Sequence, residues 1–540
     1  MIKGINETLY YNGDVVTMEN KDDRPEAVLV RNGVIAEVGV LDELKALRED
    51  RDCKMVDLEG NTLMPSFIDG HGHISMTTAY TVLANLSTAG SNEEIVQMLK
   101  DFQEKNDLTH GEPIFGYGYD HNFLEGGEHP TKDVLDQVSK DVPVGIFHTS
   151  GHMGVANSKV LEEQKITKDT PNPEGGVIGR YPDSQEPNGY LEETACFPLR
   201  LYQAQIRLNY KEKIMEAQME YVKHGITTIQ DGATDWQCVT LCRSLGEEGR
   251  LITDIVSYPC IGLDKQLINT IKNNQDCVGK YVNNFKIGGL KAVLDGSPQG
   301  KSAWMTEPYE DSGDYCGYPW LKDEDVYKGV KLAIDNNLQM LVHCNGDAAG
   351  DQYLNAYEKA YNESKNPHKE VLRPVMIHCQ TARDDQFDRM VKLNMLPSIF
   401  VAHVNYWGDV HLKNLGQKRG NRVSPVKSAL DRNMVYNFHT DTPIVPPDML
   451  HTVWTAANRI TRNGIVCGPE QRISVYDALK GVTINAAYEY SEETSKGSIK
   501  KGKRADLVIL DKNPLKVDPM AVKDIQVLAT IKDGNFIYRK

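Results

Sequence analysis

The sequence predicts an α/β protein: a TIM-like (β/α)8 barrel, a small β-sandwich built from both termini, and a long insertion after the first barrel strand. Short strand-like segments occupy both ends of the 540-residue chain. Between them, apolar runs alternate with helical stretches, which is typical of a parallel sheet covered by helices. The chain also exceeds the length that one hydrophobic core usually supports, so a large and a smaller domain are expected.

Both ends of the chain read as short strands joined by turns, and residues 1–62 and 491–540 are expected to form the two parts of the sandwich. Near the N-terminus, Asn12-Gly13 and Asn32-Gly33 lie in or after apolar runs. Asn-Gly favours the tight turn of a β-hairpin, so we predict a hairpin at both positions. The tail alternates in a similar way up to Asp533-Gly534, which places it in the same sandwich.

The middle of the chain, residues 63–490, is expected to be the barrel. Its strands are predicted at 63–70, 226–231, 253–260, 288–295, 338–344, 373–378, 396–400 and 434–441. Barrels of this type have eight strands, and their chemistry lies at the carboxyl ends of these strands. Residues from about 75 to 215 remain as an elaborate insertion after the first strand.

The first predicted barrel strand ends in two histidines, His71 and His73, spaced one residue apart. Successive side chains of a strand point to opposite faces, so these two project from the same side. Imidazoles placed in this way suit a divalent metal ion. Because the pattern is short, chance or an ordinary polar strand end explains the pair equally well on its own.

Later predicted strands carry further residues of metal-binding type. Lys291 lies inside one of them, and His343, His378 and Asp441 end three others. Singly, each has a simpler explanation, because a strand-end histidine can be satisfied by hydrogen bonds and an aspartate can cap a helix. Lys291 can likewise reach solvent or pair with Asp295. Their shared position and their order along the chain favour a metal site instead.

Five sequence motifs accompany these residues, at 151–158, 224–231, 291–297, 403–409 and 497–510. Together with the order His-x-His, Lys, His, His, Asp, they resemble the metal-dependent amidohydrolase superfamily, in particular the branch of N-substituted formamide deformylase-like proteins (amidohydrolase family 3). The resemblance covers essentially the whole chain and implies the same barrel and sandwich. Two departures concern the substrate pocket: Ile377 stands where relatives commonly carry an acidic residue, and the chain continues after Ser297 as Pro298-Gln299-Gly300.

The resemblance also implies a metal cofactor, with the ligands His71, His73, Lys291, His343, His378 and Asp441. In relatives the matching lysine reacts with carbon dioxide to give a carbamate that bridges two metal ions, so Lys291 is the candidate for this modification. Such ligands suit two zinc ions, and also iron or manganese. Water on these ions loses a proton near neutral pH, and Asp441 would pass this proton to the leaving nitrogen.

Candidate substrate contacts come from the same sequence motifs and from aromatic residues. Motifs that resemble those of the family contain His152, His403 and Trp407. Aromatic walls for an apolar substituent would come from Tyr119 and Trp304. As an alternative, His152 holds a loop by hydrogen bonds, and the aromatic residues simply pack in the core.

We therefore predict a metal-dependent hydrolase that acts on the C–N bond of an amide, an N-substituted formamide or a cyclic amide. The alternatives are a deaminase of an aminated heterocycle and a non-catalytic barrel that binds a small molecule. The formal charge of −16 argues against nucleic acid and anionic membranes as partners. No signal pattern or membrane-length apolar run is visible, and the ten cysteines are scattered. We expect a cytoplasmic homodimer with reduced thiols.

Overall fold

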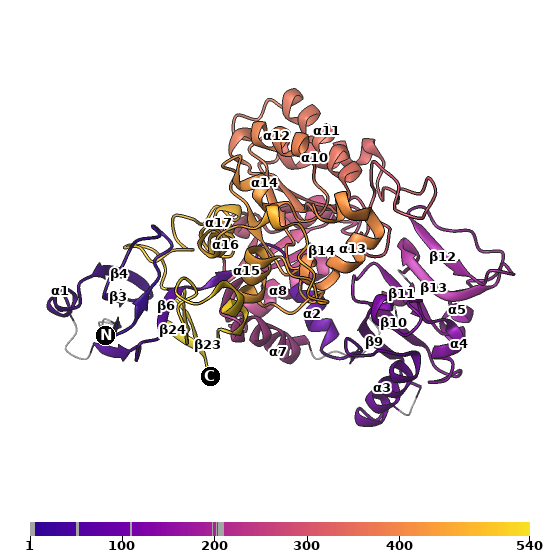
Figure 1. Ribbon diagram of the computed structural model, residues 1–540, viewed down its shortest axis with the longest axis horizontal. Helices are drawn as coiled ribbons and strands as arrows, with labels where there is room; N and C mark the ends of the chain where they lie inside the picture. The colour runs from indigo at the N-terminus through magenta and orange to yellow at the C-terminus, as the bar shows by residue number, and fades with distance from the viewer. Residues whose placement is uncertain (1–5, 50–52, 109–110, 197, 201, 203–209) are drawn as a thin grey trace.

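The computed structural model describes residues 6–49, 53–108, 111–196, 198–200, 202 and 210–540. Three parts follow one another along the longest axis of the molecule (Figure 1). A β-rich part near both termini lies at one end, a mixed α/β part lies in the centre, and a second β-rich part lies at the other end. The predicted mixed α/β class is therefore confirmed.

The part near the termini holds two β-sheets. The first has the order β4-β3-β1-β5 and contains β1 (Glu7–Tyr11), β3 (Ala27–Arg31), β4 (Val34–Gly39) and β5 (Lys54–Asp57), with helix α1 (Leu41–Ala46) between β4 and β5. The second has the order β2-β6-β22-β23-β24 and contains β2 (Asp14–Val15), β6 (Thr62–Pro65), β22 (Leu507–Leu510), β23 (Val527–Lys532) and β24 (Asn535–Arg539). Residues of both sheets, among them Tyr10, Val28, Leu507 and Ile531, share one buried hydrophobic cluster.

The two Asn-Gly turns have different outcomes. Asn32 and Gly33, with φ of 49° and 81°, connect the antiparallel strands β3 and β4, and positive φ is what the tight hairpin turn requires. Asn12 also has a positive φ, but β1 and β2 on either side of Asn12-Gly13 belong to different sheets. The predicted hairpin at Asn12-Gly13 is wrong because β1 pairs with β3 and β5, whereas β2 pairs with β6.

The segment predicted as the first barrel strand forms two short strands instead of one. β6 pairs with β22 in the terminal sheet, whereas β7 (Phe67–Ile68) pairs with β14 (Ile226–Thr234) in the central part. The change of sheet falls at Pro65, which has no backbone N–H, and at Ser66, whose N–H donates to Asp506 O (3.0 Å). The segment before His71 is therefore held by strands from three distant regions of the sequence.

The central part contains two sheets in which every strand pair is parallel. Their orders are β16-β15-β14-β7 and β17-β18-β19-β20-β21. The remaining bounds are β15 (Asp254–Pro259), β16 (Phe285–Ile287), β17 (Gly289–Val293), β18 (Gln339–Cys344), β19 (Val375–His378), β20 (Leu396–Ile399) and β21 (Asn437–Phe438). The sheets contact each other at both edges: Cys260 forms a parallel bridge with Lys291 at one, and the Gly70 N–H donates to Phe438 O (3.3 Å) at the other. The predicted strand ranges overlap all of these strands except β16.

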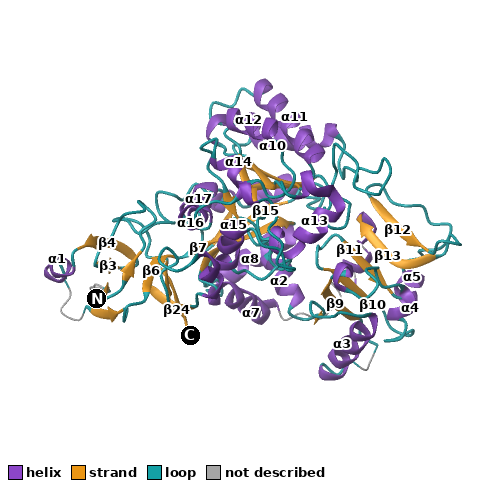
Figure 2. Cartoon of the chain, viewed as in Figure 1, coloured by secondary structure: helices purple, strands orange, loops and turns teal. Residues whose placement is uncertain are grey.

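Helices flank the central strands (Figure 2). They are α7 (Tyr210–Lys223), α8 (Trp236–Glu247), α9 (Leu267–Asn273), α10 (Asp323–Asp335), α11 (Asp347–Glu363), α12 (Asp384–Lys392), α13 (His403–Gly420), α14 (Val426–Leu430), α15 (Met449–Asn458), α16 (Val475–Gly481) and α17 (Ile484–Glu489). In α10, an acidic first turn favours the helix N-terminus, and Val326, Val330 and Ala333 bury one face. None of the described helices combines the length and the apolarity that a membrane span requires.

The predicted insertion after the first strand forms the second β-rich part. Its sheet has the order β12-β13-β11-β10-β9-β8, with β8 (Ala84–Asn85), β9 (Ile114–Tyr119), β10 (Val144–His148), β11 (Met153–Ala156), β12 (Gly176–Arg180) and β13 (Pro187–Glu193). Its helices are α3 (Asn92–Lys105), α4 (Lys132–Leu135) and α5 (Ser158–Glu163), whereas α2 (Ile74–Tyr80), which precedes them, packs against α7 and β14 of the central part. Residues 109–110, 197, 201 and 203–209 of the expected range 75–215 lie outside the described residues.

Candidate metal centre

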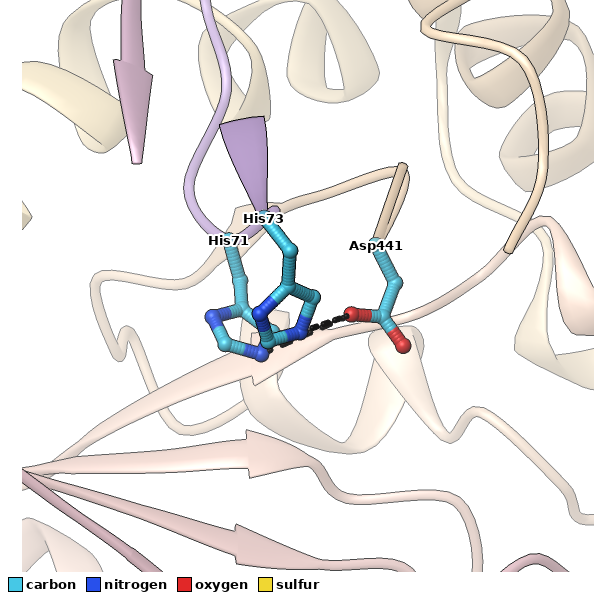
Figure 3. A group of neighbouring side chains, drawn as sticks. All are labelled: His71, His73 and Asp441. Atoms are coloured by element: carbon cyan, nitrogen blue, oxygen red, sulfur yellow. Dashed lines mark ion pairs between the residues drawn. The ribbon is translucent and has the colours of Figure 1, made fainter. Parts of the chain in front are cut away.

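Two histidines after β7 and one aspartate after β21 point toward one another (Figure 3). Asp441 Oδ1 lies 3.5 Å from His71 Nε2 and 3.1 Å from His73 Nε2. The contact between Gly70 and Phe438 places β7 beside β21, so residues far apart in the sequence meet at neighbouring strand ends. All three side chains are largely shielded from solvent.

Hydrogen bonds fix which ring nitrogen of each histidine carries the proton. The amide nitrogen of Gln230 donates to Gly70 O (2.8 Å), so its oxygen faces His71 and accepts the Nδ1 proton. His73 Nδ1 lies 2.7 Å from Gly232 O, which can only accept. In the neutral form of both rings, the Nε2 atoms that face Asp441 therefore carry lone pairs.

The carboxylate between these nitrogens lacks a compensating proton. Burial by itself raises the pKa of Asp441, but surrounding groups, the Lys291 ammonium among them, hold this pKa below its usual value, so the group is ionised at neutral pH. Its buried Oδ1 has no hydrogen-bond donor among the described residues. Two lone pairs and an anionic oxygen thus converge, and a divalent cation is the group that such a donor set fits.

The other predicted ligands lie beside this group. Lys291, on β17, places Nζ 3.1 Å from His71 Nε2, and burial lowers the pKa of Lys291 to about 8. The rings of His343, on β18, and His378, at the end of β19, have centroids 4.4 Å apart, and the His378 and His71 centroids lie 5.7 Å apart. The structure therefore brings all six predicted ligands to one end of the parallel strands.

A pocket of about 450 Å³ opens above these residues, and all six line it. His152 lines it as well, and its Nδ1 lies 2.8 Å from Glu193 Oε2. This buried carboxylate, together with other groups, holds the pKa of His152 above its usual value although burial alone lowers it. Of the five predicted substrate contacts, His152 is the one that the structure places in this pocket.

The four remaining candidates make other contacts and are not among the pocket's lining residues. Tyr119 is buried with its hydroxyl 3.1 Å from His129, and His403 is buried with Nδ1 3.0 Å from His411 Nε2. The Trp407 indole N–H donates to Asp120 Oδ2 (2.8 Å). Trp304 packs beside the main core.

Several lining or supporting residues were not indicated by the sequence. Gln230 lies within the motif 224–231, but its contact with His71 depends on β14 lying beside β7. Glu193 ends β13, and Arg200 and Trp320 line the pocket from segments without a recognisable motif. No local pattern indicates Glu193, Arg200 or Trp320, since β13 has the largely polar sequence PNGYLEE.

A second group of metal-binding type, Asp120, His121 and His148, lies in the insertion. Its protons are arranged differently. The Ser150 N–H donates to His148 Nδ1 (3.1 Å), so the proton of the neutral ring is on Nε2. This Nε2 lies 3.2 Å from His121 Nδ1 and 3.4 Å from Asp120 Oδ1, to which it can donate. Hydrogen bonds thus account for this group without a cation.

The chain matches a known family over most of its length. Residues 54–538 match the model of the Amidohydrolase family, and the chain belongs to this family. It is 25% identical to the N-substituted formamide deformylase of Arthrobacter pascens, over 99% of this chain and 98% of that protein. It is 28% identical to protein LONG AFTER FAR-RED 3 of Arabidopsis thaliana, over 98% of this chain and 91% of that protein.

A solved structure shows the same overall fold. The crystal structure of an uncharacterized metal-dependent hydrolase from Pyrococcus horikoshii OT3 superposes with a TM-score of 0.75 at 25% identity, over 95% of this chain and 99% of that one. The resemblance inferred from the sequence motifs is thereby confirmed at the level of superfamily and branch.

Proposed function

We propose that this chain is a metal-dependent hydrolase that cleaves the C–N bond of an amide, an N-substituted formamide or a cyclic amide. The observation that carries the proposal is the convergence of His71 Nε2 and His73 Nε2 on Asp441 Oδ1, while Nδ1 of each ring faces a hydrogen-bond acceptor. The name of the Arthrobacter relative supports the formamide as one candidate substrate class. Two zinc ions are the proposed cofactor, with iron or manganese as alternatives.

When bound, the metal supplies a Lewis acid that lowers the pKa of water and polarises a carbonyl group. The protein's own part is to orient its ligands and to move protons. Asp441 Oδ1 faces the histidines, so Oδ2 is the atom available to take a proton from the attacking water. The same carboxyl group then delivers this proton to the leaving nitrogen.

Lys291 is proposed to be carboxylated. Burial lowers its pKa to about 8, which leaves a part of the side chain as the neutral amine near neutral pH. The neutral amine would form an N–C bond to carbon dioxide and release a proton to water, and the oxygens of this carbamate would be available to hold a metal ion. His343 and His378 would complete the set on this side of the pocket.

The remaining expectations stay part of the proposal. We infer that the two central sheets close a TIM-like barrel, residues 63–490, through the contacts of Cys260 with Lys291 and of Gly70 with Phe438. The two terminal sheets, with their shared hydrophobic cluster, are proposed to form the sandwich of residues 1–62 and 491–540. The cytoplasmic location, the homodimer, the small-molecule substrate and the absence of nucleic acid as a partner stay predictions.

The test combines metal analysis with a substrate screen. The purified protein and the variants His73→Ala and His368→Ala are compared, since His368 is exposed and does not line the pocket. We expect bound metal in the parent and in the His368 variant and its loss in the His73 variant. The screen covers N-substituted formamides, N-acyl amines, cyclic ureas and aminated heterocycles. Full activity without metal, or turnover of the heterocycles alone, would contradict the proposal.

A further inference from the structure

Arg200 is a cationic side chain in the wall of the pocket that the metal chemistry does not use. It is exposed, and its Nη2–H donates to Gly151 O (3.0 Å), next to His152 in the chain. This bond holds one edge of the guanidinium, and no carboxylate of the described residues pairs with it. The remaining N–H groups of the fork are therefore available to a ligand.

The two acidic residues of the pocket wall are already occupied. Asp231 accepts the backbone N–H of Ser75 (3.1 Å) and its hydroxyl (2.5 Å), and Asp441 faces the two histidines. Neither is therefore left to neutralise Arg200. An anionic group of a substrate would meet an unpaired guanidinium instead of a salt bridge that it must first break.

Much of the rest of the wall is apolar. Met76, Tyr80, Phe147, Trp320 and Ile444 line the pocket together with the metal-binding residues. Side chains of this kind accept a hydrocarbon arm, whereas a few polar groups fix the orientation of the ligand. The wall thus offers three kinds of contact: a metal centre for the scissile bond, an apolar surface for an arm, and a guanidinium for an anion.

We propose that the substrate is an amide with a hydrocarbon arm that ends in a carboxylate, and that Arg200 binds this carboxylate. The hydrolysis of such a substrate rests on the proposed function. The preference of Arg200 for a carboxylate does not depend on it. Arginine pairs with carboxylates through two parallel hydrogen bonds, which gives the site a geometric as well as an electrostatic preference. A guanidinium that is merely solvated would give no such preference.

The experiment uses matched pairs of compounds on the metal-loaded protein. Each N-formyl ω-amino acid is compared with the N-formyl alkylamine of the same chain length, and kcat/KM is measured for both. The parent, Arg200→Met, Arg200→Lys and the control Arg539→Met are assayed, since Arg539 is exposed at the end of β24. We expect the parent and the control to prefer the charged compound by about 10- to 100-fold at the best chain length. Arg200→Met should abolish this preference, and Arg200→Lys should keep a part of it.

Binding is measured separately so that the two proposals can fail independently. Calorimetry compares ω-phenylalkanoates with the corresponding ω-phenylalkanamides, which require no turnover. A charge preference that disappears in Arg200→Met supports the role of Arg200 even if no formamide is hydrolysed. Equal affinity for both compounds in the parent, or a preference that persists in Arg200→Met because the carboxylate binds the metal, would overturn it.

Discussion

The side-chain oxygen of Gln230 accepts the Nδ1 proton of His71, and this contact decides which nitrogen of His71 faces Asp441. The amide nitrogen of Gln230 donates to Gly70 O (2.8 Å) and to the Tyr490 hydroxyl (3.0 Å), so the amide has one orientation that satisfies its surroundings. The orientation and the tautomer of the His71 ring are thus determined without a bound metal.

Replacing Gln230 should therefore weaken metal binding. In Gln230→Met the His71 ring loses its acceptor, and we expect the affinity for zinc to fall by about 10- to 100-fold, as is usual for such orienting partners. Competition with a chromogenic chelator measures this affinity directly. Gln97→Met is the control because Gln97 is exposed on α3. Unchanged zinc affinity in Gln230→Met would remove this residue from the site.

The variant Asp441→Asn tests the proton transfer. The amide oxygen can still approach the metal, but the side chain can no longer act as a base. We expect kcat to fall by about two to four orders of magnitude, with a smaller change in substrate affinity. Steady-state kinetics on the first substrate found, with the metal content measured in parallel, provide the answer. A variant as fast as the parent would show that Asp441 carries no proton.

The variant Lys291→Ala tests the carbamate. Without the lysine, the carbamate oxygens are missing, so both metal content and activity should be lost. A short-chain carboxylic acid that occupies the space of the side chain should restore a part of both. If Lys291→Ala keeps its metal and its activity without added acid, a carbamate at this position has no role.

Removing the metal should also destabilise the folded protein. A ligand that binds only the native state stabilises it by about 2.7 kcal/mol at a free concentration of 100 times its Kd. A chelator should therefore lower the thermal midpoint, and added zinc should restore it. The same treatment of His73→Ala should leave the midpoint nearly unchanged. Equal midpoints for the parent with and without chelator would argue against a bound metal.

A buried ion cluster outside the pocket predicts acid sensitivity. Asp254, on β15, lies 2.5 Å from Lys496 Nζ, 2.9 Å from Arg504 Nη1 and 2.9 Å from Lys532 Nζ. Burial raises the pKa of Asp254, but these three cations hold it well below its usual value. Because the folded-state pKa is the lower one, the resulting stability is present above the unfolded pKa of about 3.9 and is lost as the pH falls below it.

The variant Asp254→Asn isolates this contribution. It leaves three cations without their shared carboxylate, and we expect a loss of about 3–5 kcal/mol in the free energy of unfolding at neutral pH. Urea unfolding at about pH 7 and about pH 3 measures both the loss and its pH dependence, because the contribution of Asp254 declines only below the unfolded pKa of about 3.9. Asp388→Asn, which removes an exposed partner of Arg432, should cost less than about 1 kcal/mol. Similar losses in the two variants would contradict the argument.

The positions of the candidate ligands could be predicted from the sequence better than the residues around them. His71, His73, His343, His378 and Asp441 follow apolar strands, and strand ends can be recognised from local pattern. The acceptor of His71 could not be found in this way, because Gln230 depends on which strand lies beside β7. The same reason explains why the hairpin prediction at Asn12-Gly13 failed, because the two neighbouring strands pair with strands of different sheets.

The substrate contacts were the least predictable. The Tyr119 hydroxyl contacts His129 within the insertion, whereas the packing of the insertion against α13 decides where Trp407 points. In the structure Trp407 donates to Asp120, across 287 positions of sequence, instead of facing the pocket. Local pattern carries no information about such a contact between two distant segments.

The pairing of β6 with β22 determines when the segment before His71 can fold during synthesis. The ribosome releases the chain from its N-terminus, so residues 62–65 emerge long before residues 507–510. Until then the segment that leads into His71 has one of its sheet neighbours still unsynthesised. Contacts between such distant segments form late and slowly. The nascent chain therefore carries His71 and His73 early but cannot complete the sheet that leads into them before residues 507–510 have been synthesised.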